Sequence, residues 1–182
     1  MEFLTREILE QALRLMGELA QERGIQLEIC VYGGSAMLLA YQSRNATKDV
    51  DATLNPRKEG NQLAAIVAKR LGLHEDWLNE DVRKFLGPDP REGRRELDLN
   101  IPGLKTFVVT ANYLLAMKAI ACRRPLPGYR GDQEDLVFLI RKLEIKSVDE
   151  IQKKLDRFFP DEVISDGNRL VLETLIEEAH HA

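Results

Sequence analysis

Apolar and polar positions follow two different patterns along this chain, and the change comes near residue 110. Before that point, strand-like alternation, as over residues 27–32, stands between segments whose apolar residues recur every three or four positions. From residue 111 onward every patterned segment is helical. The pattern therefore predicts an α/β core over 1–110 and an α-helical region over 111–182. Because no polar linker separates the two, we expect a single structural unit.

The expected elements follow from this periodicity and from the turn residues between the segments. Helices are expected over 5–22, 35–42, 60–71, 76–86, 111–123, 132–143, 147–158 and 168–180, and strands over 27–32, 48–54, 96–101 and 104–109. Thr5 is expected to cap the first helix, Gly72 to end the helix 60–71, and Pro102-Gly103 to join the last two strands. The fold class predicted is α/β (α+β), with a small mixed sheet, flanking helices and a helical C-terminal half that closes over the site.

Composition and charge narrow the class of protein. Hydrophobic residues make up 44% and charged residues 31% of 182, which is typical of a globular domain. No run of 18 apolar residues predicts a membrane span, and the first residues lack the apolar core of a signal peptide. Cys30 and Cys122 lie in apolar runs and are expected to be reduced core thiols of a cytoplasmic protein. The net charge of −4 argues against sequence-independent clamping of duplex nucleic acid.

A glycine turn follows the first predicted strand. Gly33-Gly34-Ser35 stands between that strand and a short helix, so free backbone N–H groups and the positive end of the helix point at one spot. Glycines at this place let the backbone and a ligand approach closely. The pattern predicts a phosphate site formed by Gly33, Gly34 and Ser35, with ordinary turn chemistry as the alternative.

Two aspartates share one face of the next predicted strand. Asp49 and Asp51 are two residues apart, so both carboxylates project to the same side, while Val50 and Ala52 supply an apolar opposite face. Adjacent carboxylates repel one another unless a cation lies between them. Such oxygen pairs suit Mg²⁺ (or Mn²⁺), which takes its remaining ligands from water and phosphate. We expect Asp49 and Asp51 to bind this metal; two solvated acids on an exposed strand are the alternative.

Two charged residues of the helical half fall on apolar faces. Lys118 follows Leu115 by three positions, and Asp135 shares a stripe with Leu139, so a helix turns both side chains inward. A buried lysine is costly unless it meets an anion. Either Lys118 and Asp135 form an ion pair between two helices, or Lys118 binds the phosphates of a nucleotide while Asp135 positions the lysine or an acceptor. Asp132 is the expected N-cap of the later helix.

A third carboxylate on a later strand would complete a two-metal site. Asp98 is the candidate, because it alternates with apolar residues in the predicted strand 96–101. The alternative is a solvent-facing hairpin residue.

Two further residues are given simpler roles. Trp77 is expected to be a core anchor, and Ser35 has no nearby histidine or lysine in sequence to make it a nucleophile.

The chain resembles the DNA polymerase β-like nucleotidyltransferase superfamily, and within it the small bacterial proteins related to toxins of type IV toxin–antitoxin (abortive infection) systems. The resemblance covers roughly residues 25–160 and rests on Val-Tyr-Gly-Gly-Ser-Ala at 31–36, Thr-Lys-Asp-Val-Asp at 47–51, Asp-Trp-Leu-Asn at 76–79, Tyr-Leu-Leu-Ala-Met-Lys-Ala-Ile-Ala at 113–121 and Asp-Gln-Glu-Asp-Leu at 132–136. The G-x-G-x-x-G spacing of dinucleotide-binding proteins is absent from the turn.

The resemblance implies a metal-dependent nucleotidyltransferase, with Lys118 and Asp135 as transfer residues beside Asp49 and Asp51. Its expected substrate is a nucleoside triphosphate (NTP), its acceptor a hydroxyl of tRNA or of a protein, and its further partner a cognate antitoxin. An alternative is a binding or regulatory (antitoxin-like) protein that keeps the scaffold without catalysis; loss of a third acid would favour it.

Local basic clusters could admit RNA despite the acidic net charge. They comprise Arg91, Arg94 and Arg95; Arg123, Arg124 and Arg130; and Lys153 and Lys154. Arg123, Arg124 and Arg130 flank the loop between the Lys118 and Asp135 helices, and we expect this loop to receive a nucleic-acid acceptor such as the end of a tRNA. Solvated charge on loops and helix faces is the alternative for each cluster.

Overall fold

A computed structural model describes residues 3–122 and 132–181, which divide into two compact units. Unit 1 takes the chain up to Phe85 together with Arg94–Val109, and unit 2 takes Leu86–Gly93 together with the chain from Thr110 onward. The boundary after Val109 falls where the sequence pattern changes. The loop 86–93 belongs with the helices of unit 2.

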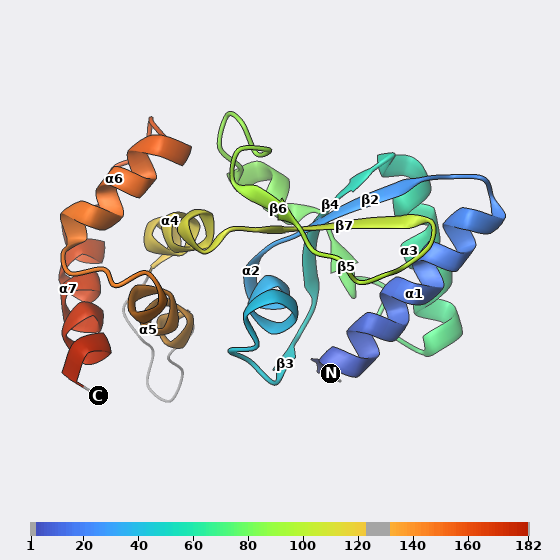
Figure 1. Ribbon diagram of the computed structural model, residues 1–182, viewed down its shortest axis with the longest axis horizontal. Helices are drawn as coiled ribbons and strands as arrows, with labels where there is room; N and C mark the ends of the chain where they lie inside the picture. Colours follow the sequence, from blue (N-terminus) through green and yellow to red (C-terminus); the bar gives the residue numbers. More distant parts are fainter. Residues whose placement is uncertain (1–2, 123–131, 182) are drawn as a thin grey trace. The chain divides into compact units, whose positions relative to one another are not determined.

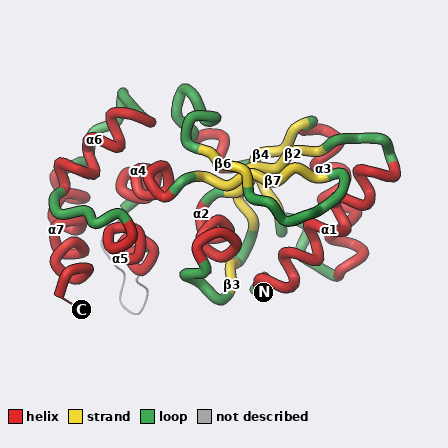
Figure 2. The backbone as a smooth tube through the Cα atoms, in the orientation of Figure 1, coloured by secondary structure: helices red, strands yellow, loops and turns green. Residues whose placement is uncertain are grey.

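Unit 1 combines helices with a mixed sheet (Figures 1 and 2). Its elements in chain order are β1 (Leu4–Thr5), α1 (Arg6–Glu22), β2 (Leu27–Val31), α2 (Gly33–Ala36), the π-helix η1 (Met37–Tyr41), β3 (Ala46–Thr47), β4 (Val50–Asn55), α3 (Arg57–Leu71), β5 (Leu78–Asn79), the 3₁₀-helix η2 (Asp81–Phe85), β6 (Arg94–Glu96) and β7 (Leu104–Val109). The main sheet has the order β5-β4-β2-β7-β6, and β1 pairs with β3 in a separate two-stranded sheet. The predicted mixed α/β class is confirmed.

The register of the main sheet determines which residues of neighbouring strands lie opposite one another. The central strand β2 runs antiparallel to β4, with Val31 opposite Ala52, and parallel to β7, with Val31 opposite Val108. On the far side of β7, the antiparallel strand β6 brings Arg95 opposite Val108. At the other edge, β5 runs parallel to β4 and pairs Asn79 with Asp51.

The two faces of the sheet differ in polarity because side chains alternate along each strand. On one face, Ala52, Val31 and Val108 form a fully buried row. This apolar face lies against α1 and α3 (Figure 1). The opposite face carries Asp51 and Thr53 of β4, which are only half-buried. The carboxylate of Asp51 therefore lies on the face of the sheet opposite that row.

The segment 76–86 is not the helix that its leucine and tryptophan spacing predicts. It forms the short edge strand β5 and then η2. Trp77 is buried, and its indole Nε1 donates to the carbonyl of Ala64 at 3.0 Å, which confirms its predicted role as a core anchor. Its own carbonyl accepts from Val50 N at 2.7 Å. Pairing with the edge of β4 therefore outweighs the local helical pattern.

Unit 2 consists of helices joined by loops (Figure 2). They are α4 (Ala111–Ala121), α5 (Gln133–Lys142), α6 (Val148–Phe158) and α7 (Asp166–His181). Helix α4 packs on α6, and α5 packs on α7. The hydroxyls of Thr110 and Ser147 cap α4 and α6. No helix among the described residues is long and apolar enough to cross a membrane.

Candidate active site

The glycine turn meets the second aspartate directly. Tyr32, which follows β2, donates its N–H to the carbonyl of Asp51 at 2.8 Å. Gly33 then starts α2 with a positive φ of 55°, and a Cβ atom added to it would lie 2.8 Å from Asp51 Oδ2. A side chain at Gly33 would therefore face both a strained backbone and a steric clash. The turn and the carboxylate are in contact because residue 33 is glycine.

The first aspartate lies near an asparagine of the neighbouring strand. Asp49 is exposed in the bend before β4, whereas Asp51 is half-buried on the strand. Asn79, opposite Asp51, directs its Nδ2 at Asp49 Oδ2 at 3.5 Å, the outer limit of a hydrogen bond. Its Oδ1 accepts from Asp81 N at 3.0 Å, which fixes the orientation of the amide. The sequence did not predict Asn79 as a site residue, because its segment was expected to form a helix.

This acid pair suits a metal that needs few protein ligands. The described part of the chain contains no group of three or more His, Cys, Asp and Glu side chains that could hold a metal ion. Mg²⁺ is commonly bound by one or two carboxylates together with water and substrate phosphates. Asp49 and Asp51 therefore fit one such ion, with the glycine turn beside them for the phosphates.

The hydroxyl of Ser35 is engaged within the turn. Its side chain is 1% exposed, and its hydroxyl donates to the carbonyl of Tyr32 at 2.9 Å, within the helix that runs on through η1. The hydroxyl therefore serves the turn itself, and Ser35 can reach a phosphate only through its backbone N–H. A cation lies beside the second glycine of the turn. A Cβ added at Gly34 would lie 3.1 Å from Arg44 Nη1 and 3.0 Å from Thr47 Oγ1. The only signal for Arg44 in the sequence is its charge: with Lys48, it is one of two cations between the turn and the acid pair.

Asp98 does not join the acid pair. Strand β6 ends at Glu96, and after one more ladder bond, from Leu97 N to Thr106 O at 2.9 Å, the chain leaves the sheet. Asp98 is exposed, and its carboxylate accepts from Asn100 N at 2.9 Å. This aspartate-initiated turn ends the strand earlier than Pro102-Gly103 would.

The sheet register separates Asp98 from Asp51. Arg95 is level with Val108 and, across β2, with Ala52, so Asp51 lies one step toward the start of β6 and Asp98 lies three steps the other way. Four steps of ~3.3 Å amount to ~13 Å along the strand direction alone. The expected metal site of Asp49, Asp51 and Asp98 therefore reduces to the first two residues.

Lys118 and Asp135 belong to unit 2, where they form an ion pair between two helices, the first of the two alternatives that the sequence left open. Lys118 Nζ of α4 lies 2.8 Å from Asp135 Oδ2 of α5 and 2.6 Å from Asp132 Oδ1. Lys118 is 6% exposed and Asp135 2% exposed. Asp132 occupies the N-cap position of α5 as expected, but its side chain makes no cap bond and binds the lysine instead. The buried ammonium is therefore balanced within its own unit.

A buried glutamate supports the strand that carries Asn79. The side chain of Glu80 is 5% exposed and accepts from Leu54 N at 3.1 Å, from Arg57 and Arg83 at 2.6 Å each and from Asn61 at 3.2 Å. Burial by itself raises the pKa of Glu80, but these hydrogen bonds together outweigh it and hold the pKa below its ordinary value of 4.5. Glu80 therefore ties β4, α3 and η2 together behind the acid pair.

Replacing Glu80 by glutamine is expected to destabilise the protein by about 2 kcal/mol at pH 7, because hydrogen bonds to a charged acceptor are lost. A lowered pKa stabilises the folded state fully above pH 4.5, and this contribution is lost as pH falls through the folded-state pKa. Urea unfolding should show that the free energy of unfolding decreases less between pH 7 and pH 3 in Glu80→Gln than in the parent. The exposed Glu75→Gln is the matched control; equal decreases in parent and Glu80→Gln would contradict the assignment.

The predicted RNA-binding cluster of Arg123, Arg124 and Arg130 lies outside the described residues.

Searches with this chain against protein-family models, curated proteins and solved structures find no match.

Proposed function

We propose that this protein is a metal-dependent nucleotidyltransferase that moves a nucleotidyl group from an NTP to an acceptor hydroxyl. The observation that carries the proposal is the contact between Gly33 and the Asp51 carboxylate. It joins a helix N-terminal turn, which suits phosphate, to an acid pair, which suits the divalent ion of a nucleotide. Separately, each feature has a simpler explanation; in contact, they form a site for a metal-bound polyphosphate.

The roles of the residues follow from their positions. Asp49 and Asp51 would hold Mg²⁺ (or Mn²⁺), and Asn79, opposite Asp51, directs its amide nitrogen at the Asp49 carboxylate. When bound, the ion supplies positive charge that offsets charge developing on the leaving pyrophosphate. The backbone N–H groups of the turn bind phosphate oxygens, and Arg44 beside Gly34 adds a cation.

Lys118 and Asp135 take a structural role in this proposal. A lysine that contacts two carboxylates at 2.6 and 2.8 Å has its charge more than balanced, so it offers little attraction to a phosphate. We therefore assign the pair to joining α4 and α5. A tRNA or protein acceptor and a cognate antitoxin rest on the family resemblance alone.

A second candidate function is nucleotide binding without transfer, as in a regulatory or antitoxin-like protein. The exposed position of Asp98 favours it, because this aspartate, the candidate third carboxylate, lies away from the acid pair. Both functions need the same metal–nucleotide site, and only one of them consumes the NTP.

Labelled nucleotides separate the two. The protein is incubated with Mg²⁺, total cellular RNA or total cellular protein, and each of ATP, CTP, GTP and UTP carrying label at the α- or the γ-phosphate. Nucleotidyl transfer labels an acceptor from the α- but not the γ-position, and Asp51→Asn should abolish the labelling. Nucleotide binding without labelling of any acceptor would favour the binding protein, and label from the γ-position alone would replace the proposed reaction by phosphoryl transfer.

A further inference from the structure

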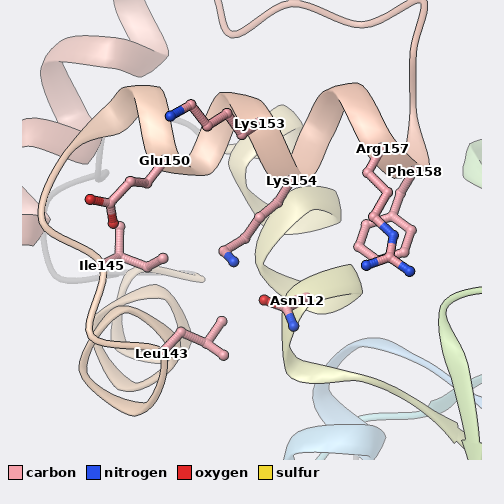
Figure 3. A pocket seen from close by; sticks show the side chains of 8 residues that line it. All are labelled: Asn112, Leu143, Ile145, Glu150, Lys153, Lys154, Arg157 and Phe158. Atoms are coloured by element: carbon pink, nitrogen blue, oxygen red, sulfur yellow. The ribbon is translucent and has the colours of Figure 1, made fainter.

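A pocket within unit 2 has the lining of an anion site. Its volume is about 360 Å³, within the range of small-ligand pockets. Figure 3 shows its lining side chains, which come from α4, α6 and the segment between α5 and α6. They are Asn112, Leu143, Ile145, Glu150, Lys153, Lys154, Arg157 and Phe158. Three cations against one carboxylate leave an excess of two positive charges, in a protein whose net charge is −4.

Existing contacts account for only part of this charge. Glu150 Oε2 accepts from Lys146 N at 3.0 Å, and Arg157 Nε donates to Glu92 Oε1 at 2.7 Å. Lys154 is half-buried, and among the described residues neither it nor Lys153 forms a hydrogen bond or ion pair. The charge of Lys154 is therefore available to a ligand, and an anion in the pocket would pair with it through a charge-assisted hydrogen bond.

The pocket also holds an unmatched acceptor. Asn112 Oδ1 is buried and has no hydrogen-bond partner within the described part of the chain. In Figure 3 the side chains of Lys154 and Asn112 point toward one another, whereas Lys153 points away from both. An unpaired buried carbonyl oxygen destabilises the protein, and a hydroxyl or amine donor from a ligand would remove this cost. Asn112 is also the second residue of α4, whose N-terminal end favours negative charge.

We propose that this pocket is a second, metal-independent site for a ribose phosphate. Lys154 and Arg157 bind the phosphate, and Asn112 Oδ1 accepts a hydrogen bond from a neighbouring ribose hydroxyl. Phosphate matches the paired cations, and a hydroxyl beside it matches the acceptor, so the ligand carries both groups. The source of the ribose phosphate is a free nucleotide or an RNA strand. The site is independent of the acid pair of unit 1 and of the proposed transfer.

Calorimetric titration of the full chain tests this site. The chain carries Asp49→Asn and Asp51→Asn, and EDTA removes divalent metal, so the proposed metal–nucleotide site does not contribute. We expect saturable binding of ribose 5-phosphate, about fivefold or more tighter than inorganic phosphate, because only the sugar reaches Asn112. Lys154→Met should lower the affinity for both ligands about tenfold, equivalent to about 1.4 kcal/mol. Asn112→Ala should erase the preference for the sugar phosphate while phosphate binding persists.

Controls and the second source complete the test. Lys69→Met makes the same charge change at an exposed position of α3 and should leave both affinities unchanged. Melting temperatures close to the parent's ensure that the variants are folded. A 5′-phosphorylated RNA octamer that binds over tenfold tighter than ribose 5-phosphate identifies RNA as the source, and equal affinities identify a free nucleotide. The absence of saturable ribose 5-phosphate binding, or binding that survives Lys154→Met, overturns the proposal.

Discussion

Replacing Lys118 by methionine is expected to lower the free energy of unfolding by about 3–5 kcal/mol. The substitution removes the ammonium that contacts Asp135 and Asp132, and Asp135 is only 2% exposed. Methionine fills a similar volume, so the loss comes from the carboxylate left without its cation rather than from a cavity. Chemical unfolding monitored by circular dichroism measures the change directly.

A double variant separates charge from packing. Lys118→Met combined with Asp135→Leu removes both buried charges and should regain most of the lost stability, since an apolar pair of similar volume is often as stable as a buried ion pair. Asp132→Asn should cost less than Lys118→Met, because the side chain of Asp132 is 49% exposed. If Lys118→Met melts near the parent temperature but loses nucleotide-dependent activity, Lys118 binds the nucleotide and our structural assignment is wrong.

Mg²⁺ together with an NTP is expected to stabilise the parent by about 2–3 kcal/mol at millimolar nucleotide and a dissociation constant of tens of micromolar. Asp49→Asn combined with Asp51→Asn should abolish this stabilisation, since the amides cannot replace two anionic metal ligands. Without ligand, the double variant should be at least as stable as the parent, because the repulsion between neighbouring carboxylates is gone. Thermal melting with and without Mg²⁺ and NTP gives both values.

Asp98→Asn is the matched control for this experiment, since it makes the same chemical change on an exposed aspartate of the same unit. It should keep the full ligand-induced shift. Loss of the shift in Asp98→Asn would mean that Asp98 takes part in metal binding, contrary to its exposed position in the turn after β6. An undiminished shift in the Asp49/Asp51 double variant would remove the metal-site assignment altogether.

The helices and the central strands could be predicted because one periodic pattern covers each of them. Helix α1 ends at Glu22 as expected, and Thr5 caps it by accepting from Ile8 N. The glycine turn and Asp51 come together because a short helix between antiparallel neighbours leaves little freedom in where they meet. Local pattern and tertiary structure agree at these positions.

The errors arise where pairing between distant segments decides the structure. Asn79 lies on an edge strand that exists only because β4 offers it hydrogen bonds, so its own sequence cannot reveal it. Asp98 alternates with apolar residues as a strand residue would, yet its carboxylate binds Asn100 N and turns the chain away. Arg44 was identifiable as a cation, but its place beside Gly34 depends on the course of the η1–β3 connection.

The pairing of β2 with β7 has a consequence for synthesis on the ribosome. Leu27 pairs with Leu104, which follows it by 77 residues (104 − 27), so the central strand is made long before its parallel partner. Chains emerge N-terminus first, and an unpaired strand edge invites pairing with other chains. Until Val109 has left the exit tunnel, one edge of β2 is open and α1 lacks the strand that it covers. Fragments that stop before residue 104 should therefore aggregate rather than fold, although they contain the glycine turn and both aspartates.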